Sequence, residues 1–400
     1  MIEWFCTICY QEQETEKEIP ESCVKCGAGS ASIIPLTEQS SDTKGTDLIG
    51  GFENLEQVRD RARTKLKGIC AAYPHCDGNS DRICQREAYG KPIGLGGAGS
   101  GASFTANVTS LARLRLQTRL VGDHFDPDPS FLFFGLRLSM PIMGSSTAGI
   151  SRYNDAMSEM DFCRATIRGC REVGALAWRG DTWFYTPENT PALDALESEG
   201  GYGVPIFKPR TQDVLKGLIE RAEKAGCPAT GVDLDGCGST IMERNGQPVF
   251  RKSIKDLKEL VAFTSLPFIA KGIMTPEDAE ACLEAGVRVI SVSNHGGRIL
   301  DYTPGVAEVL PAIVERVGKN ALITADGGVR TGYDVIKMLA LGADAVLIGR
   351  DVIRAAVGGG SLGVRLQMER LQNTLKRAMK MTGCPNLSAV TSAVLYDHCG

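Results

Sequence analysis

One stretch of the sequence, residues 325–350, reads ADGGVRTGYDVIKMLALGADAVLIGR. An apolar run ends in a glycine-rich turn, an amphipathic segment follows, and a second apolar run closes with Arg350. A strand, a helix and a second strand in this order predict a parallel βαβ unit. Glycines at a helix N-terminus let backbone N–H groups approach an anion, and Arg330 and Arg350 can add charge-assisted hydrogen bonds. The stretch therefore predicts a phosphate site at the ends of two neighbouring strands.

The same alternation extends back to residue 140. The apolar runs are residues 140–147, 174–180, 203–209, 229–235, 267–273, 287–294, 321–328 and 345–351. Amphipathic segments between most of them end in glycine, as a helix C-cap often does. Eight such units in about 260 residues predict an α/β fold, a closed (β/α)₈ TIM barrel. An open doubly wound sheet would alternate in the same way, but no G-x-G-x-x-G motif opens the first unit. The glycine-rich segment 94–104 precedes the strand series and is interpreted as a tight loop.

Bulk composition excludes several classes of protein. The 400 residues carry a net charge of −4, with 43% hydrophobic and 23% charged residues, and contain no basic block. Nucleic-acid and membrane partners are therefore not expected. No apolar run approaches the roughly 20 residues that span a bilayer. The N-terminus lacks the pattern of a signal peptide, so the fourteen cysteines favour a reducing, cytoplasmic location.

Composition also suggests four regions. Residues 1–36 are expected to form a small metal-binding domain with four cysteine ligands, 37–60 a linker, 61–138 a helical and loop lead-in, and 139–400 the barrel. The first region pairs its cysteines as C-x₂-C, thirteen residues, C-x₂-C, and these are Cys6, Cys9, Cys23 and Cys26. Four thiolates in two such pairs predict a tetrahedral site for iron or zinc. Cys70, Cys76 and Cys84 follow no standard cluster spacing, and buried thiols are the default interpretation.

Polar residues stand where several of the apolar runs end. They are Asp233, Lys271, His295, Asp326 and Arg350. In a barrel of this class, catalytic groups gather at the C-terminal ends of the strands. His295 is the candidate general base, because Gly296 and Gly297 permit close approach of a ligand and a carboxylate can stabilise the protonated imidazole. Asp233 is its natural partner and Asp235 the competing one. A satisfied core histidine and a surface lysine are the structural alternatives.

These motifs carry a resemblance to a known family. The segments KGIMTPEDA, SNHGGRILDY and DGGVRTGYDVIKMLALGADAVLIGR resemble the FMN-dependent α-hydroxy-acid dehydrogenase/oxidase family, which includes glycolate oxidase. The resemblance is strongest over residues 265–350. The N-terminal cysteine pairs resemble the short rubredoxin-like domain of rubrerythrins.

The resemblance implies a barrel that holds FMN, with roles assigned by position. His295 would be the base, Asp233 its partner and Arg298 the clamp for a substrate carboxylate. Lys271 would face the flavin and stabilise its reduced form. The remaining cofactor-binding residues would be Thr147, Ala148, Ser293, Asp326, Gly328, Arg330, Gly349 and Arg350.

The chain also departs from the family pattern. Pro205 stands where the active-site tyrosine is expected, and Gly231 replaces a threonine. The second carboxylate-binding arginine has no clear counterpart, although Arg244 is a candidate. These differences argue against a small unadorned hydroxy acid such as lactate as the substrate.

Two functions from different classes remain open. The first is an FMN-dependent oxidoreductase that oxidises a 2-hydroxy acid or related carbinol and passes electrons through a four-cysteine iron centre to a redox partner protein. The second is an FMN-dependent isomerase with a structural zinc ribbon, although the extra basic residues and Mg²⁺ site that it needs are not evident. A homo-oligomer is expected in either case.

Overall fold

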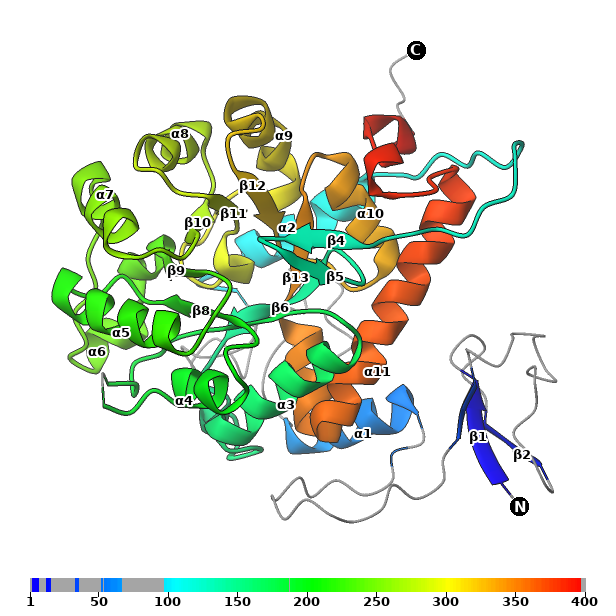
Figure 1. The fold of residues 1–400 in the computed structure, drawn as a ribbon, viewed down its shortest axis with the longest axis horizontal. Coiled ribbons are helices and arrows are strands. Elements are labelled where there is room, and N and C mark those ends of the chain that lie inside the picture. The colour runs from blue at the N-terminus through cyan, green and yellow to red at the C-terminus, as the bar shows by residue number, and fades with distance from the viewer. Residues whose placement is uncertain are drawn as a thin grey trace.

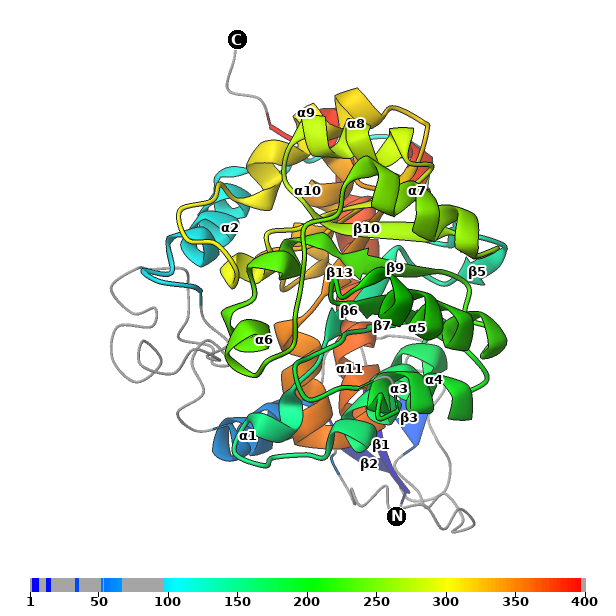
Figure 2. The same cartoon turned by 90° about the vertical axis from the view of Figure 1, so that its left-hand side faces the viewer.

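The computed structural model describes residues 52, 54–66, 97–186 and 188–396, and the backbone of three short strands nearer the N-terminus. Its centre is a closed barrel of parallel strands in the order β10-β11-β12-β13-β6-β7-β8-β9 (Figure 1). Helices follow the strands and cover the outside of the barrel, as the view turned by 90° shows (Figure 2). The predicted (β/α)₈ fold is therefore confirmed.

All eight apolar runs contain a barrel strand. The strands are β6 (Ile142–Thr147), β7 (Ala177–Arg179), β8 (Val204–Phe207), β9 (Thr230–Asp233), β10 (Phe268–Ile273), β11 (Val289–Val292), β12 (Leu322–Ala325) and β13 (Ala345–Ile348). The helices that follow them are α3 (Glu159–Glu172), α4 (Pro191–Ser198), α5 (Gln212–Lys224), α7 (Ile254–Phe263), α8 (Pro276–Glu284), α9 (Val306–Val317), α10 (Gly332–Ala340) and α11 (Arg350–Thr382). A short helix α6 (Thr240–Arg244) lies between β9 and α7.

Local sequence sets where these helices begin. Thr275 caps α8 by accepting a hydrogen bond from the Asp278 N–H, and Pro276 occupies the first turn, where its missing N–H costs nothing. Thr331 and Asp334 form a reciprocal capping box at the start of α10. Both helices therefore start directly after a strand–loop segment that faces the C-terminal end of the barrel.

The opposite end of the barrel is closed by a hairpin of β4 (Phe131–Phe133) and β5 (Leu136–Leu138). Phe133 and Leu138 are buried in one cluster with side chains near the N-terminal ends of the strands, among them Met143, Val204 and Val289. The hairpin excludes water from this end of the interior. The cavity found among the described residues lies at the other end of the barrel, where the strands finish.

Helix α1 (Leu55–Lys65) corrects the predicted linker, because it begins inside the segment 37–60. Its Val58 packs on a glycine-rich part of α11, where a Cβ at Gly358 would lie 2.0 Å from the Val58 carbonyl oxygen. Both views show the two helices side by side (Figures 1 and 2). A second lead-in helix, α2 (Ala102–Arg113), follows later in the chain.

The N-terminal strands β1 (Ile2–Cys6), β2 (Glu12–Thr15) and β3 (Ile33–Pro35) form an antiparallel sheet in the order β2-β1-β3. Cys9, Cys23, Cys26 and the side chain of Cys6 lie outside the described residues, so the metal site predicted there stays a prediction. Cys70, Cys76 and Cys84 also lie outside them. Among the described residues, no helix is long and apolar enough to cross a membrane.

Candidate active site at the C-terminal end of the barrel

Side-chain alternation along the strands brings polar groups into the mouth of the barrel. Ile269 and Val289 point into the apolar interior, so the residues two positions further on each strand face the same way. Those residues are Lys271 and Ser291. Ser293 lies two residues after Ser291, just beyond the end of β11. The strand pairs align Lys271 with Asp233 on one side and with Ser291 on the other. The interior thus changes from apolar to charged along the barrel axis.

Lys271 lies at the centre of a buried hydrogen-bonded cluster. Its Nζ atom is 3.1 Å from Asp233 Oδ1, 3.1 Å from Ser293 Oγ and 3.9 Å from Asp326 Oδ2. Ser293 Oγ donates to Asp326 Oδ2 at 2.9 Å and accepts from the His295 backbone N–H at 3.0 Å. Five of the residues predicted from sequence are therefore in one network.

Burial and charge set the protonation states of this network. Burial lowers the pKa of Lys271, but the carboxylates of Asp233, Asp326 and Asp235 outweigh it and raise that pKa above its ordinary value. Burial alone would raise the pKa of Asp233, but the nearby His295, Lys208 and Lys271 hold it well below the usual range. Burial raises the pKa of Asp326, only partly offset by Lys271. Lys271 and Asp233 are thus charged at neutral pH.

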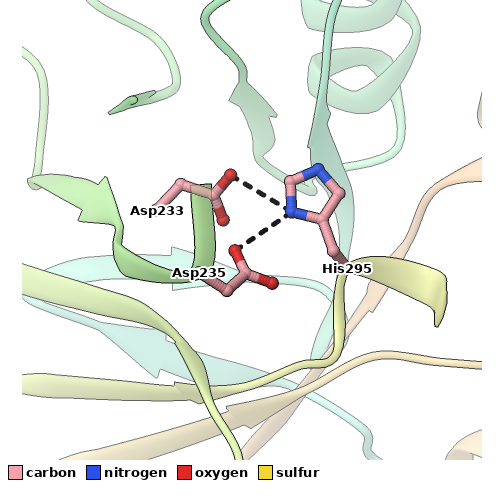
Figure 3. A group of neighbouring side chains, drawn as sticks. All are labelled: Asp233, Asp235 and His295. Atoms are coloured by element: carbon pink, nitrogen blue, oxygen red, sulfur yellow. Dashed lines mark hydrogen bonds and ion pairs between the residues drawn. The ribbon is translucent and has the colours of Figure 1, made fainter. Parts of the chain in front are cut away.

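His295 projects from the short helix η4 (His295–Gly297) that follows β11. Its backbone has φ 58°, a left-handed conformation that is uncommon for a non-glycine residue. The Asn294 side chain accepts a hydrogen bond from the Gly297 N–H and closes the turn. The imidazole Nδ1 lies 3.2 Å from Asp233 Oδ2 and 3.1 Å from Asp235 Oδ1 (Figure 3). Both candidate partners therefore contact the histidine, and the sequence-based choice of Asp233 alone was incomplete.

The expected phosphate end of the site lies after β12 and β13. Gly328, Arg330, Gly349 and Arg350, for which phosphate binding is expected, all line the cavity. Arg350 donates to the Gly296 carbonyl oxygen at 2.9 Å, and its guanidinium lies 4.5 Å from the centroid of the Phe104 ring. These contacts hold Arg350 beside the N-terminus of α11, where the backbone N–H groups favour an anion.

A cavity of about 440 Å³ connects the phosphate end to His295, and Thr147 and Ala148 line it between them. Its volume is in the range of cofactor sites. The buried Oδ1 of Asp326 and Oγ1 of Thr147 have no hydrogen-bond partner within the described chain, so each can bond to a ligand. Arg298 also lines the cavity, where its Nη2 is 3.3 Å from the Tyr153 hydroxyl. The residues present fit FMN.

Sequence reasoning missed three parts of this cavity. The first is the loop Gly97–Gly99, which lines it and is held by a 2.7 Å bond from the Ala98 N–H to the Gly297 carbonyl oxygen. The second is Tyr153 and the third is Lys208. β8 is buried along its whole length and reads as a continuous apolar run, so no period-two pattern identified Lys208 as an inward residue. Tyr153 carried no signal either.

Two expectations drawn from the family resemblance need correction. From β8 the cavity is lined by Ile206 and Lys208, not by Pro205, so the missing tyrosine had been placed on a residue outside the site. Arg244 is exposed on α6 and does not line the cavity, so it is no substitute for a second carboxylate-binding arginine.

Asp233, Asp235 and His295 are also the only group in the described part of the chain whose ligand atoms are close enough to share a metal ion. Lysine ammonium groups already occupy both oxygens of Asp233, Lys208 at 2.7 Å and Lys271 at 3.1 Å. They place positive charge where a cation would have to bind. The arrangement therefore favours proton transfer over metal binding.

A parallel barrel with a cationic phosphate end and a buried lysine beside the cavity defines a flavin-binding class of protein. The model of the FMN-dependent dehydrogenase family matches residues 94–247 and 239–397. The chain belongs to this family, and it is an FMN-dependent oxidoreductase.

Relatives of established name cover most of the chain. The chain is 28% identical to the 2-hydroxyacid oxidase of Dictyostelium discoideum, over 92% of its own length and 96% of the relative's. It is 30% identical to 2-hydroxyacid oxidase 1 of Homo sapiens, over 76% and 90% of the two chains. A crystal structure of mandelate oxidase superimposes with a TM-score of 0.69 at 27% identity, covering 86% of this chain and 98% of that one.

Proposed function

We propose that the protein oxidises a 2-hydroxy acid to the corresponding 2-oxo acid. The observation that carries the proposal is the imidazole of His295, held by two carboxylates in the cavity that fits FMN and that Arg298 also lines. Relatives named 2-hydroxyacid oxidase, glycolate oxidase and L-lactate oxidase support the substrate class.

The proposed roles follow from the contacts. Arg298 binds the substrate carboxylate, because a guanidinium forms two parallel hydrogen bonds with that group. His295 has Nδ1 on the carboxylates, so Nε2 is the atom that takes the proton of the substrate hydroxyl. FMN supplies the acceptor for the hydride. Lys271 keeps its positive charge, which stabilises negative charge that develops beside it.

The cavity supports a substrate larger than lactate. Trp183 and Arg152 both line it, and the Arg152 guanidinium lies 5.0 Å from the centroid of the Trp183 ring. A flat cationic and aromatic surface suits an aromatic or extended side chain better than a methyl group.

The test is anaerobic mixing of the purified protein with a panel of 2-hydroxy acids, from lactate to mandelate and longer side chains. The protein is expected to copurify with FMN and not FAD, because the site offers a single phosphate end. Loss of the flavin absorbance band with at least one hydroxy acid, and formation of the 2-oxo acid, would support the proposal. Flavin that stays oxidised with the whole panel would refute it.

The alternative is an FMN-dependent isomerase whose N-terminal module is a structural zinc ribbon. It has less support, because lysines occupy the only metal-competent carboxylate group of the described residues. An isomerase would leave the flavin oxidised after turnover, so the same absorbance measurement distinguishes the two functions.

The electron outlet is a further part of the proposal. Four cysteines in two C-x₂-C pairs on the same chain suggest an iron centre that takes electrons from the flavin site and passes them to a redox partner protein. A cytoplasmic location and a homo-oligomer are proposed with it.

A further inference from the structure

Lys208 is a buried cation at the end of β8, in direct contact with Asp233. Its side chain is 10% exposed, and Nζ lies 2.7 Å from Asp233 Oδ2. Its backbone N–H donates to Asp181 Oδ2 at 3.0 Å, which fixes the start of the loop. A Cβ at Gly236 would lie 2.9 Å from Lys208 Cδ, so the stem is packed under the turn after β9. The ammonium is therefore held in place and is not a mobile surface charge.

This lysine competes with His295 for one carboxylate oxygen. His295 Nδ1 is 3.2 Å from Asp233 Oδ2, the same atom that Lys208 approaches to 2.7 Å. Lys271 occupies the other oxygen, Oδ1, at 3.1 Å. Two ammonium groups thus share the Asp233 carboxylate with the imidazole, and their positive charges disfavour a further cation, the imidazolium, beside them.

Asp235 brings a second carboxylate to His295, which offsets the positive charge of the lysines. Its Oδ1 lies 3.1 Å from His295 Nδ1, and its Oδ2 is buried without a hydrogen-bond partner in the described chain. No lysine or arginine of the described residues forms an ion pair with it. Gly272 leaves room for this carboxylate, because a Cβ there would lie 2.7 Å from Asp235 Cγ. His295 is therefore the one ion-pair partner of Asp235 among the described residues.

Lys208 and Asp235 add one positive and one negative charge to the cluster around His295. The cations are Lys208, Lys271 and the imidazolium, and the carboxylates are Asp233, Asp235 and Asp326. The remaining charged groups near the turn are Arg298 on the same loop and Arg350, which bonds to the Gly296 carbonyl oxygen. In the proposed function, Arg298 binds the substrate carboxylate and Arg350 the cofactor phosphate.

We infer that Lys208 and Asp235 are a matched pair of positioning residues for His295. Lys208 places a positive charge on the Asp233 oxygen that His295 Nδ1 also approaches, and Asp235 offsets that charge with a second carboxylate at Nδ1. The inference rests on the proposed role of His295 as the base, but it concerns the ionisation of the imidazole and can be measured without turnover.

The experiment compares Lys208→Met, Asp235→Asn and the double variant, using the FMN-loaded protein with ¹³C-labelled histidine. The chain has four histidines, and His295→Gln assigns the signal of interest. Asp235→Asn should move the titration midpoint of His295 down by about one pH unit, because an anion within about 4–6 Å favours the charged form. Lys208→Met should move it up. The double variant should return within about 0.3 of a unit of the wild type if the two changes offset each other.

Rates give a second measurement. Asp235→Asn should slow flavin reduction by ~10-fold or more, since the imidazolium loses its carboxylate, and the acid limb of the pH profile should move to lower pH. Asp126→Asn and Lys258→Met, both on the exposed surface, serve as matched charge controls and should change neither quantity.

An unchanged His295 midpoint in Asp235→Asn would overturn the inference, and so would a double variant that stays as far displaced as Asp235→Asn alone. Retained FMN and an unaltered thermal unfolding midpoint show that each variant is folded. If the Lys208→Met protein is not folded, Lys208→Gln takes its place. If the midpoints move as expected but no hydroxy acid reduces the flavin, the pair stands and the proposed function fails.

Discussion

The unusual residues of the site are charged groups in a place where a barrel normally packs hydrocarbon. Moving an isolated ammonium into such an interior costs several kcal/mol, so Lys271 is stable there only because Asp233 and Asp326 are within reach. Their charges keep its pKa above the ordinary value in spite of burial. The cluster therefore presents a permanent positive charge to whatever occupies the cavity, and it does so without rearrangement.

At this scale the first prediction concerns His295. His295→Ala should retain FMN but reduce it with substrate ~10²–10⁴-fold more slowly, because general-base assistance typically contributes that factor. Rapid mixing under anaerobic conditions measures the rate. His124→Ala is the control, since His124 is exposed with its nearest ionic partner 4.0 Å away. Turnover close to the wild type in His295→Ala would show that another group takes the proton.

Much of this site could be predicted, because the signals lie within single short segments of the sequence. Lys271, Asp233 and Asp326 each lie at or near the end of a largely apolar strand, so the change of residue type marks the mouth of the barrel. Lys208 was missed because the strand before it is buried on both faces and reads as a continuous apolar run. Its side-chain direction depends on the register with β9, which pairs Ile206 with Gly231. The register between two strands cannot be deduced from the sequence of one of them.

At the scale of elements, the barrel depends on a hairpin outside the eight repeating units. Strands β4 and β5 place Phe133 and Leu138 among the interior side chains at the N-terminal ends of the strands. Phe133 is fully buried and lies 4.9 Å, centroid to centroid, from Phe134 in an edge-on arrangement. The apolar surface buried here stabilises the end of the barrel remote from the chemistry.

We therefore predict that Phe133→Ala lowers the free energy of unfolding by about 3–5 kcal/mol, the usual cost of removing a buried aromatic ring. Urea denaturation followed by circular dichroism measures it. Leu132→Ala on the exposed face of the same strand should change stability by less than about 0.5 kcal/mol. FMN content of the folded Phe133→Ala protein should be unchanged, because the hairpin lies at the closed end. A stability loss equal in both variants would contradict this role.

The repeating units were predictable from sequence, whereas the hairpin and helix α1 were not. Period and capping signals repeat through the barrel, as in the Thr275 and Thr331 caps. The assignment of each βα unit therefore supports the assignment of the next. Nothing in the sequence indicates which part of the fold the hairpin segment FLFFGLRL covers. The predicted linker 37–60 includes the start of helix α1 because that segment is polar, although Leu55 and Val58 bury an apolar stripe against α11.

At the scale of the whole molecule, the proposed function requires a route by which electrons leave the flavin site. Reduction of the flavin by a hydroxy acid delivers two electrons, and a one-electron iron centre on the same chain would pass them on singly. The backbone of residues 2–35 includes an antiparallel three-stranded sheet, with Cys6 at the end of β1. We expect a domain this small to depend on a bound metal for its folding.

We predict that Cys6, Cys9, Cys23 and Cys26 bind one iron per chain and that this iron is reduced when the flavin is. Zinc fits the same tetrahedron but has no redox chemistry, so the choice of metal decides whether the module conducts electrons. Protein expressed anaerobically with ample iron should contain iron near one per chain and show the visible absorbance of a ferric thiolate site. Substrate should then bleach the iron and flavin bands together.

Cys9→Ser is the informative variant and Cys237→Ser its control, because Cys237 is a partly exposed thiol outside the N-terminal module. Cys9→Ser should lose the iron and keep flavin reduction by substrate, since the barrel holds its own cofactor site. It should also slow steady-state electron delivery to a one-electron acceptor protein, whereas Cys237→Ser should not. Iron-replete protein that still binds only zinc, or iron that stays ferric while the flavin is reduced, would leave the module a structural zinc ribbon and require another route for the electrons.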